Sequence, residues 1–171
     1  IYPLTMKTET KKQEITWQKI QDDLADKSGL AILLNEDASL SNIAKSNNNS
    51  ICEVLTASDE FAPKCQKFCG KVFENAVEAE KPLKYKCYAG LECVAVPFKN
   101  EANQQFVAIA GRAFTKSEDY RKATERAISG DWKKFPPTKF FENILLTSSS
   151  QNLENIAKTL STLSVEEKLS L

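Results

Sequence analysis

Cysteine is the residue type with the most chemistry to offer in this chain, because five cysteines are present and histidine is absent. Cys65 and Cys69 stand four residues apart in a segment of helical periodicity, so their thiols should share one helix face. Apolar residues continue along that face, which predicts that it points into the core, near the strand that carries Cys87. Zinc and iron–sulfur clusters prefer thiolate ligands. A zinc or iron–sulfur site could therefore form from Cys52, Cys65, Cys69 and Cys87.

Two other interpretations fit the same thiols. Buried cysteines often act as small hydrophobic residues in a core, and a redox-active or disulfide-forming pair would also use them. The spacing of the cysteines matches no zinc-ribbon or ferredoxin signature. Because the count is odd and no signal peptide is visible, we expect free thiols in a reducing cytosol, and so a cytoplasmic protein.

The composition argues against several classes of protein. Without histidine, the chain alone cannot build a Ser-His-Asp or Cys-His catalytic unit, so we expect no enzyme. Lysine plus arginine and aspartate plus glutamate both number 23, and this balance argues against direct nucleic-acid binding. No apolar run approaches the roughly 18 residues of a membrane span.

Two further places could contribute to a ligand pocket. Gly90 lies between two predicted strands, where a glycine lets the backbone turn or approach a ligand closely, and Tyr88 offers a ring and a hydroxyl. Arg112 follows Gly111 at the end of a strand and could bind a carboxylate with two hydrogen bonds. The plainer alternatives are an ordinary connection with one exposed tyrosine and a solvated charge at a strand end.

Hydrophobic periodicity and turn residues divide the chain into helices and strands. Capping-box spacing from Ser50 to Glu53 predicts the start of a short helix, and a longer helix should follow Pro63 up to about residue 80. Its apolar stripe should turn Cys65, Phe68 and Val72 toward the strand of Cys87. A further helix is expected at residues 16–27, and strands at 30–34, 39–44, 83–87, 93–98 and 106–114. These pieces form an antiparallel sheet with helices across one face, which is an α+β fold.

The last third of the chain is predicted to be helical, at residues 117–129, 137–146 and 151–163. The final segment carries apolar residues at steps of three, four and three, the spacing of a coiled-coil seam. This seam either packs back on the core or pairs with the same helix of a second chain. The step pattern favours pairing, so we expect a homodimer with Leu160 near its centre. The seam consists of Leu153, Ile156, Leu160 and Leu163.

Several short strings, in this order and spacing, resemble one family. They are Leu24-Ala25-Asp26-Lys27-Ser28-Gly29-Leu30 with Asn35-Glu36-Asp37, then Ser50-Ile51-Cys52, then Cys65, then Lys86-Cys87-Tyr88-Ala89-Gly90-Leu91, then Val94-Ala95-Val96-Pro97-Phe98 and Ala108-Ile109-Ala110-Gly111-Arg112. Together they resemble the PocR-type sensory domain, a PAS-like domain of bacterial signalling proteins. The resemblance implies a PAS/GAF-like antiparallel sheet of about five strands, with helical extensions at both ends.

The resemblance also implies a function. Domains of this family are thought to bind small organic molecules, such as hydrocarbon derivatives, and to pass the signal to an attached output domain or protein. Cys52, Cys65 and Cys87 match the family's three cysteines, whereas Cys69 and Cys93 depart from its pattern, and the extra thiols favour a metal or cluster. The expected ligand-binding residues are Cys52, Cys65, Cys87, Tyr88, Gly90, Leu91 and Arg112.

The sequence as a whole is interpreted as a signalling module in three parts. Residues 1–14 form a flexible segment, residues 15–115 the sensory domain, and residues 116–171 a helical extension. The expected function is sensing of a small organic ligand, with the signal relayed through the helices. The alternative function is a cysteine-based metal, iron–sulfur or redox sensor.

Overall fold

The computed structural model describes residues 17–40 and 42–166 of the 171-residue chain, so the predicted flexible segment 1–14 lies outside the described residues. Eight of the elements belong to the sensory region that the sequence predicted, and three helices follow them. In chain order the elements are α2 (Trp17–Ser28), β1 (Ala31–Asn35), β2 (Asn42–Ser46), α3 (Ser50–Thr56), α4 (Ala62–Ala79), β3 (Leu83–Lys86), β4 (Glu92–Lys99), β5 (Gln105–Ala113), α5 (Ser117–Ile128), α6 (Pro137–Phe140) and α7 (Gln151–Glu166).

The third element of that region, β2, lies later in the chain than the strand predicted at residues 39–44. Asp37 explains the shift, because its carboxylate accepts hydrogen bonds from Ser39 and its carbonyl accepts one from the Leu40 amide at 3.2 Å, which forms a turn. Leu40 itself has a left-handed φ of 61°. The turn therefore occupies the residues assigned to the strand start, and pairing with β1 begins at Asn42.

The five strands form one open sheet in the order β2-β1-β5-β4-β3, and every neighbouring pair is antiparallel. This confirms the α+β fold with a five-stranded, PAS/GAF-like antiparallel sheet. β5 lies at the centre, and eight of its nine residues are buried because helices cover both faces of the sheet. Central strands covered on both faces are continuously apolar rather than alternating, which is the pattern of both β4 and β5.

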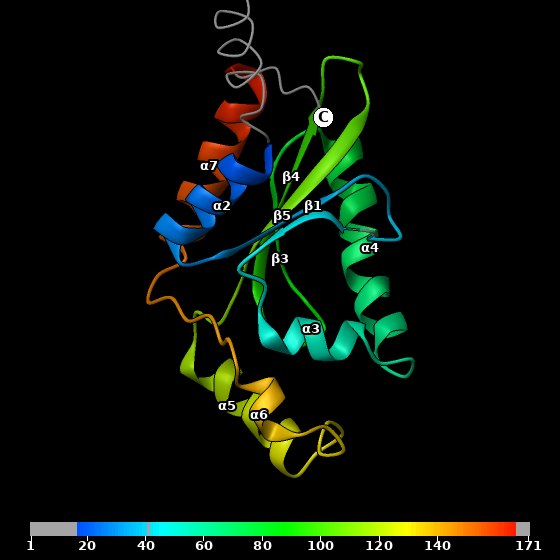
Figure 1. The fold of residues 1–171 in the computed structure, drawn as a ribbon, viewed down its shortest axis with the longest axis vertical. Coiled ribbons are helices and arrows are strands. Elements are labelled where there is room, and N and C mark those ends of the chain that lie inside the picture. The colour runs from blue at the N-terminus through cyan, green and yellow to red at the C-terminus, as the bar shows by residue number, and fades with distance from the viewer. Residues whose placement is uncertain (1–16, 41, 167–171) are drawn as a thin grey trace, which may run out of the picture.

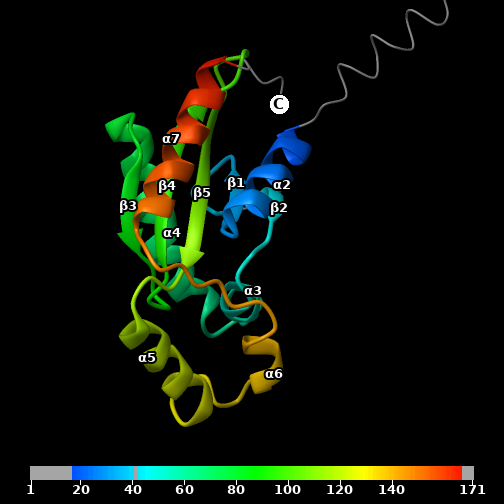
Figure 2. The same cartoon turned by 90° about the vertical axis from the view of Figure 1, so that its left-hand side faces the viewer.

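Helices cover both faces of this sheet, whereas the sequence predicted helices across one face and extensions at the ends. Figure 1 shows α2 and α7 on one side of the sheet and α4 on the other, with α3 below α4. Val94 and Val96 of β4 pack toward the terminal helices, and Cys93 and Ala95 pack toward α4. The terminal helices are therefore part of the core rather than appendages. Figure 2 shows α5 and α6 beyond the end of the sheet, next to α3.

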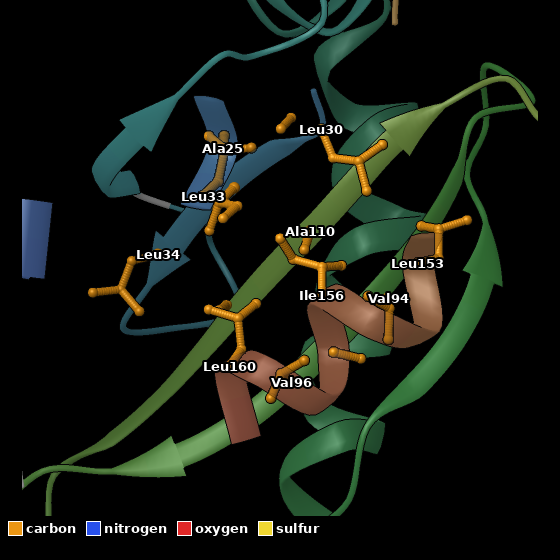
Figure 3. Close-up of a cluster of buried hydrophobic side chains, with 14 of the residues drawn as sticks. Ala25, Leu30, Leu33, Leu34, Val94, Val96, Ala110, Leu153, Ile156 and Leu160 are labelled. Atoms are coloured by element: carbon orange, nitrogen blue, oxygen red, sulfur yellow. The ribbon is translucent and has the colours of Figure 1, made fainter. Parts of the chain in front are cut away.

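The apolar seam of α7 is buried within its own chain. Leu153, Ile156 and Leu160 pack into the core cluster that also contains residues of β4 and β5, and Leu160 is 0% exposed (Figure 3). The prediction that Leu160 lies near the centre of a dimer seam is therefore wrong, because the sheet already covers it. A four-residue apolar stripe fits a sheet face as well as a partner helix, so spacing alone could not separate the two. The homodimer itself stays a prediction.

The rotation of α4 also differs in part from the expectation. Its buried residues are Cys69, Gly70, Phe73 and Ala76. Cys65 and Val72 are partly buried, but Phe68 is 46% exposed, so its predicted inward orientation is wrong. A methyl group on Gly70 would lie 2.8 Å from the Ala38 carbonyl oxygen, so the glycine brings this face of the helix against the chain that follows β1. That close approach turns Phe68 to the edge of the buried face.

The helix predicted at residues 137–146 ends early, since α6 covers only Pro137–Phe140. Beyond it the chain pairs with the end of the sheet instead. The Phe114 amide donates to the Leu145 carbonyl, and the Thr147 amide donates to the Phe114 carbonyl, both at 3.0 Å. These bonds satisfy backbone groups that a longer helix would have used, and they anchor the α5–α6 segment to the sheet.

Candidate functional site

Four of the five cysteines meet at a small cavity between α3, α4 and the sheet. The cavity has a volume of about 20 Å³, which is close to the minimum that one water molecule needs. It brings together the four cysteines predicted as metal ligands, and with them Tyr88 and Arg112. Its walls are formed by Cys52, Leu55, Thr56, Cys65, Cys69, Cys87, Tyr88, Ala89 and Arg112.

A larger cavity of about 190 Å³ adjoins the first. The two cavities share the side chains of Thr56, Cys65, Cys69 and Arg112 as walls. The larger one extends toward the segment after β1, where its lining becomes polar. We call the two together the Arg112 cavity. The remaining lining residues are Ser39, Leu40, Asn42, Lys45, Asn48, Glu53, Ala62 and Gln66.

A β-bulge turns Arg112 into this cavity. Cys93 pairs with Gly111 and Glu92 with Ala113, so Arg112 is an extra residue without a partner on β4. Ala108 and Ala110 point toward α7, and a Cβ on Gly111 would also point there, toward Leu153. The bulge thus shifts the alternation by one residue and sends Arg112 to the opposite face. Both bulge residues have positive φ, 101° for Gly111 and 50° for Arg112.

Two asparagines that the sequence analysis did not single out hold Arg112 in place. Its Nη1 donates to Asn48 Oδ1 at 2.9 Å, and its carbonyl accepts from Asn49 Nδ2 at 2.9 Å. Asn49 is fully buried and is also the N-cap of α3, because its Oδ1 accepts from the Ile51 amide at 2.9 Å. The predicted capping residue, Ser50, instead donates to the Phe140 carbonyl. The run of asparagines before Ser50 was the available sequence signal.

The charge at the Arg112 cavity is unbalanced. Arg112 is 6% exposed, and the ion pairs among residues 17–40 and 42–166 do not include it. Glu53, the carboxylate on the cavity wall, pairs with Lys45 at 3.2 Å and accepts from Asn48 Nδ2 at 2.7 Å. The hydrogen bond from Asn48 is the main reason that the pKa of Glu53 is lowered. Within the described residues, no carboxylate pairs with the buried guanidinium.

Three of the lining thiols are neutral at ordinary pH. Burial raises the pKa of Cys52 and of Cys65 to about 12. Burial also raises the pKa of Cys69, whose sulfur accepts a hydrogen bond from the Tyr85 hydroxyl at 3.5 Å. These thiols resist ionisation because a thiolate loses its hydration in this apolar setting.

Cys87 behaves differently from the other thiols. A hydrogen bond from the Cys93 thiol, together with bonds from the Leu91 and Ala89 amides, lowers the pKa of Cys87 to about 6. The pKa of Cys93 is raised well above its usual value, first by burial and then by the same contact with Cys87. Cys87 is therefore the most acidic thiol of the cavity, and it is partly exposed. Low-pKa, accessible thiolates are the reactive ones in proteins.

The metal site predicted from the cysteines has its residues on one cavity but lacks a coordinating arrangement. Within the described part of the chain, no group of three or more cysteine, aspartate or glutamate side chains is placed to hold a metal ion. All five cysteines are unpaired thiols. The thiols are thus mostly neutral and spread around a cavity, and this arrangement does not fit a metal ion.

The predicted residues Gly90 and Leu91 shape the site without lining it. Gly90 has a φ of 88°, and its amide donates to the Cys87 carbonyl at 3.0 Å. The Cys87 amide donates to the Leu91 carbonyl at 2.9 Å, which closes the turn between β3 and β4. Leu91 is fully buried in the core. This turn sets the positions of Cys87 and Tyr88.

Tyr88 connects the cavity to α5. Its hydroxyl accepts from Arg126 Nη2 at 2.7 Å, and the guanidinium of Arg126 lies 4.7 Å from the centre of its ring. Arg126 also stacks 3.8 Å from the ring centre of the buried Trp132 and pairs with Asp131 at 2.8 Å. The sequence analysis missed Arg126, because nothing in its local pattern indicates that it would meet Tyr88. Through these contacts Tyr88 presents a fixed ring to the cavity.

Comparison with known proteins gives one family. The family model described as "Sensory domain found in PocR" matches residues 14–165, which covers α5, α6 and all but the last residue of α7. No curated protein and no solved structure matches the chain. Among residues 17–40 and 42–166, no helix has the length and apolar character needed to cross a membrane.

Proposed function

The chain belongs to the family of sensory domains found in PocR, and we propose that it senses a small organic ligand bound in the Arg112 cavity. The observation that carries this proposal is the cavity itself, which gathers Arg112, Tyr88 and four cysteines between the sheet and α3–α4. The 190 Å³ part is several times the space of about 10–15 Å³ that one water molecule needs, so it has room for a small organic molecule. A ligand of that size is a small metabolite.

The relay of the signal would run through α7. Gly111 touches Leu153 on one face of the sheet, while the next residue, Arg112, lines the cavity on the other face. A ligand that moves Arg112 would therefore act on the bulge that α7 packs against. An output domain or protein that contacts α7 would receive the change. A bacterial cytoplasm suits this sensor, because a reducing compartment keeps its unpaired thiols free.

The experiment is a thermal-shift screen of the full chain against small organic metabolites, followed by calorimetric titration of the hits. A ligand that binds the folded state raises the melting temperature, and the stabilisation grows with the logarithm of one plus the ratio of its concentration to Kd. Arg112→Met and Thr56→Val should weaken binding of the hits, whereas Ile128→Ala, at an exposed position on α5 far from the cavity walls, should not. Hits whose affinity is unchanged by both cavity variants would argue against this site.

A second candidate function is a thiol-based sensor of oxidants or metals, and the acidic Cys87 next to Cys93 is the observation that favours it. The test is to purify the protein without oxygen, measure zinc and iron by elemental analysis, and titrate free thiols after unfolding. Bound metal near one equivalent per chain, or loss of two thiols on mild peroxide treatment, would support this function. Five free thiols per chain both before and after peroxide treatment, together with no bound metal, would rule this function out.

A further inference from the structure

Arg112 is a buried cation with unused hydrogen-bonding capacity. A guanidinium carries five N–H donors, and the partners that face this one are Asn48 Oδ1 and the Cys69 sulfur. Both partners are uncharged: Asn48 is an amide, and burial raises the pKa of the Cys69 thiol. The other donors face a space large enough for a molecule, since Arg112 borders both parts of the cavity.

A buried charge without an opposite charge is costly, so folded proteins rarely keep one unless it has a task. Here the fold goes further and arranges the backbone to place it, through a bulge residue with a left-handed φ of 50°. Strained backbone of this kind clusters at functional sites. The fold therefore holds Arg112 in this position at the cost of backbone strain. The lack of a carboxylate paired with it, within the described residues, is the feature that the ligand must explain.

Two groups of the chain itself could supply that counter-charge. Glu53 is already paired with Lys45 and bonded to Asn48, so it is not available to Arg112. Cys87 lies on the same cavity wall, but its pKa is lowered mainly by hydrogen bonds from Cys93 and two backbone amides, and Arg112 is the smallest of the causes. Neither group provides the paired oxygens that fit the fork of a guanidinium.

We infer that the ligand of the Arg112 cavity is a small carboxylate anion, whose carboxylate pairs with the Arg112 guanidinium. This rests on the proposed function and names the chemical class of its ligand. The Asn48 side chain, bonded to Arg112 at 2.9 Å, fixes the guanidinium for two-pronged binding. The apolar remainder of the ligand would lie against Leu40 and Ala62, which also line the larger part.

A monoanion fits this cavity better than a phosphate group. Phosphate sites combine several donors of positive charge, typically a glycine-rich loop at the start of a long helix. The Arg112 cavity has one unpaired cation, and its second cation, Lys45, is already neutralised by Glu53. One guanidinium matches the single charge of a carboxylate, and the volume of 190 Å³ matches a short carbon chain.

The test uses matched probes on the full chain in a non-thiol reductant. Short straight and branched carboxylates, from acetate to valerate and including lactate, are titrated beside the amide and the alcohol of the same skeleton, and beside inorganic phosphate. The inference expects at least one carboxylate to bind about tenfold to hundredfold more tightly than its amide and alcohol, the range set by a charge-assisted hydrogen bond. Equal binding of an amide or alcohol would overturn the carboxylate inference and leave the small-ligand function standing.

The remaining outcomes are equally decisive. Binding of phosphate in preference to every carboxylate would show that the anion class is wrong. No binding by any probe at millimolar concentration would count against the carboxylate class and, if the wider metabolite screen is also silent, against the sensing function itself. Two different results therefore separate a failure of this inference from a failure of the proposed function.

Variants locate the site. Arg112→Met keeps an unbranched apolar stem and removes the charge, so it should abolish the preference for carboxylate over amide. Arg112→Lys keeps the charge without the fork and should retain only part of it. Lys84→Met, at a half-exposed lysine of β3 outside the cavity walls, is the matched control and should change affinity less than about threefold. If Arg112→Met does not fold, Asn48→Ala tests the same geometry, and an unchanged carboxylate preference in either variant would refute the assignment.

Discussion

Replacing Gly111 by alanine tests the bulge that positions Arg112. Gly111 has a φ of 101°, a conformation that costs a non-glycine residue about 1–3 kcal/mol. The new methyl group would also overlap Leu153 Cδ2 and lie 2.9 Å from the Glu92 carbonyl oxygen. The carbonyl belongs to the paired β4 strand and cannot move easily, whereas Leu153 can rotate away if it gives up part of its packing.

The magnitude follows from these two contributions. A fully buried leucine gains about 1.5–3 kcal/mol from its burial, and Leu153 is 2% exposed. Losing much of that packing, in addition to the backbone strain, gives an expected destabilisation of roughly 3–5 kcal/mol for Gly111→Ala. This is a large fraction of the 5–15 kcal/mol that holds a typical domain folded.

The assay is urea unfolding followed by tryptophan fluorescence, since Trp17 and Trp132 are both buried. Gly29→Ala is the matched control, because Gly29 also has a positive φ, 70°, but nothing lies within 4 Å of its added methyl group. That variant should lose only the backbone part, about 1–2 kcal/mol. The difference between the two variants measures the steric part together with any extra backbone strain at the wider φ of Gly111.

The double variant Gly111→Ala/Leu153→Ala separates the contact with α7 from the rest. Removing the leucine side chain relieves one overlap, so the double variant should be at least about 1 kcal/mol more stable than the sum of the two single effects predicts. Strict additivity would show that α7 does not pack on the bulge. A Gly111→Ala variant no less stable than Gly29→Ala would refute the reasoning about the bulge as a whole.

Three further outcomes are expected. Iodoacetamide should modify Cys87 with a rate that is half-maximal near pH 6, because hydrogen bonds from Cys93 and two amides lower the pKa of Cys87 to about 6. Cys93→Ala should move this midpoint upward. A wild-type midpoint near the ordinary thiol value of 9.0 would contradict the prediction. Burial raises the pKa of Cys52 from 9.0 to about 12, so between pH 9 and pH 12 this thiol ionises in the unfolded state and not in the folded one. The free energy of unfolding should therefore fall by about 1.4 kcal/mol between about pH 8 and pH 10. Cys52→Ala should remove this loss. Leu160→Ala should destabilise the fold by about 2–5 kcal/mol without changing the sedimentation of the chain. Leu163→Ala, at a partly exposed position, should destabilise the fold less. A changed oligomeric state with unchanged stability would instead show that this face of α7 is a dimer interface.

Most elements of the fold could be predicted from the sequence because local signals define them. Apolar runs between turn residues predicted β3, β4 and β5 to within one or two residues. Pro63 marked the start of α4, since proline is favoured in the first turn of a helix. These signals depend on neighbours along the chain, so they survive without knowledge of the tertiary structure.

The site could be predicted only in part, for a physical reason that Arg112 illustrates. The sequence brought the cysteines, Tyr88 and Arg112 into one candidate list, and the structure does place them around one cavity. The burial of Arg112 depends on a one-residue shift in pairing between β4 and β5, which no local pattern specifies. The side of the sheet that α7 covers is likewise decided by packing and not by its apolar spacing.

The bulge connects the two faces of the sheet through a single peptide bond. On one side Gly111 is pressed by Leu153 of α7, and on the other the Arg112 carbonyl is held by Asn49, which also caps α3. A strained backbone persists only where its surroundings hold it from several directions, so α3 and α7 together maintain the conformation that aims Arg112. A ligand can shift this balance only by the difference in its affinity for the two arrangements of the guanidinium. An anion that pairs with Arg112 has such a difference, because it supplies the paired oxygens that neither Glu53 nor Cys87 offers to the guanidinium, and a neutral molecule of the same shape does not.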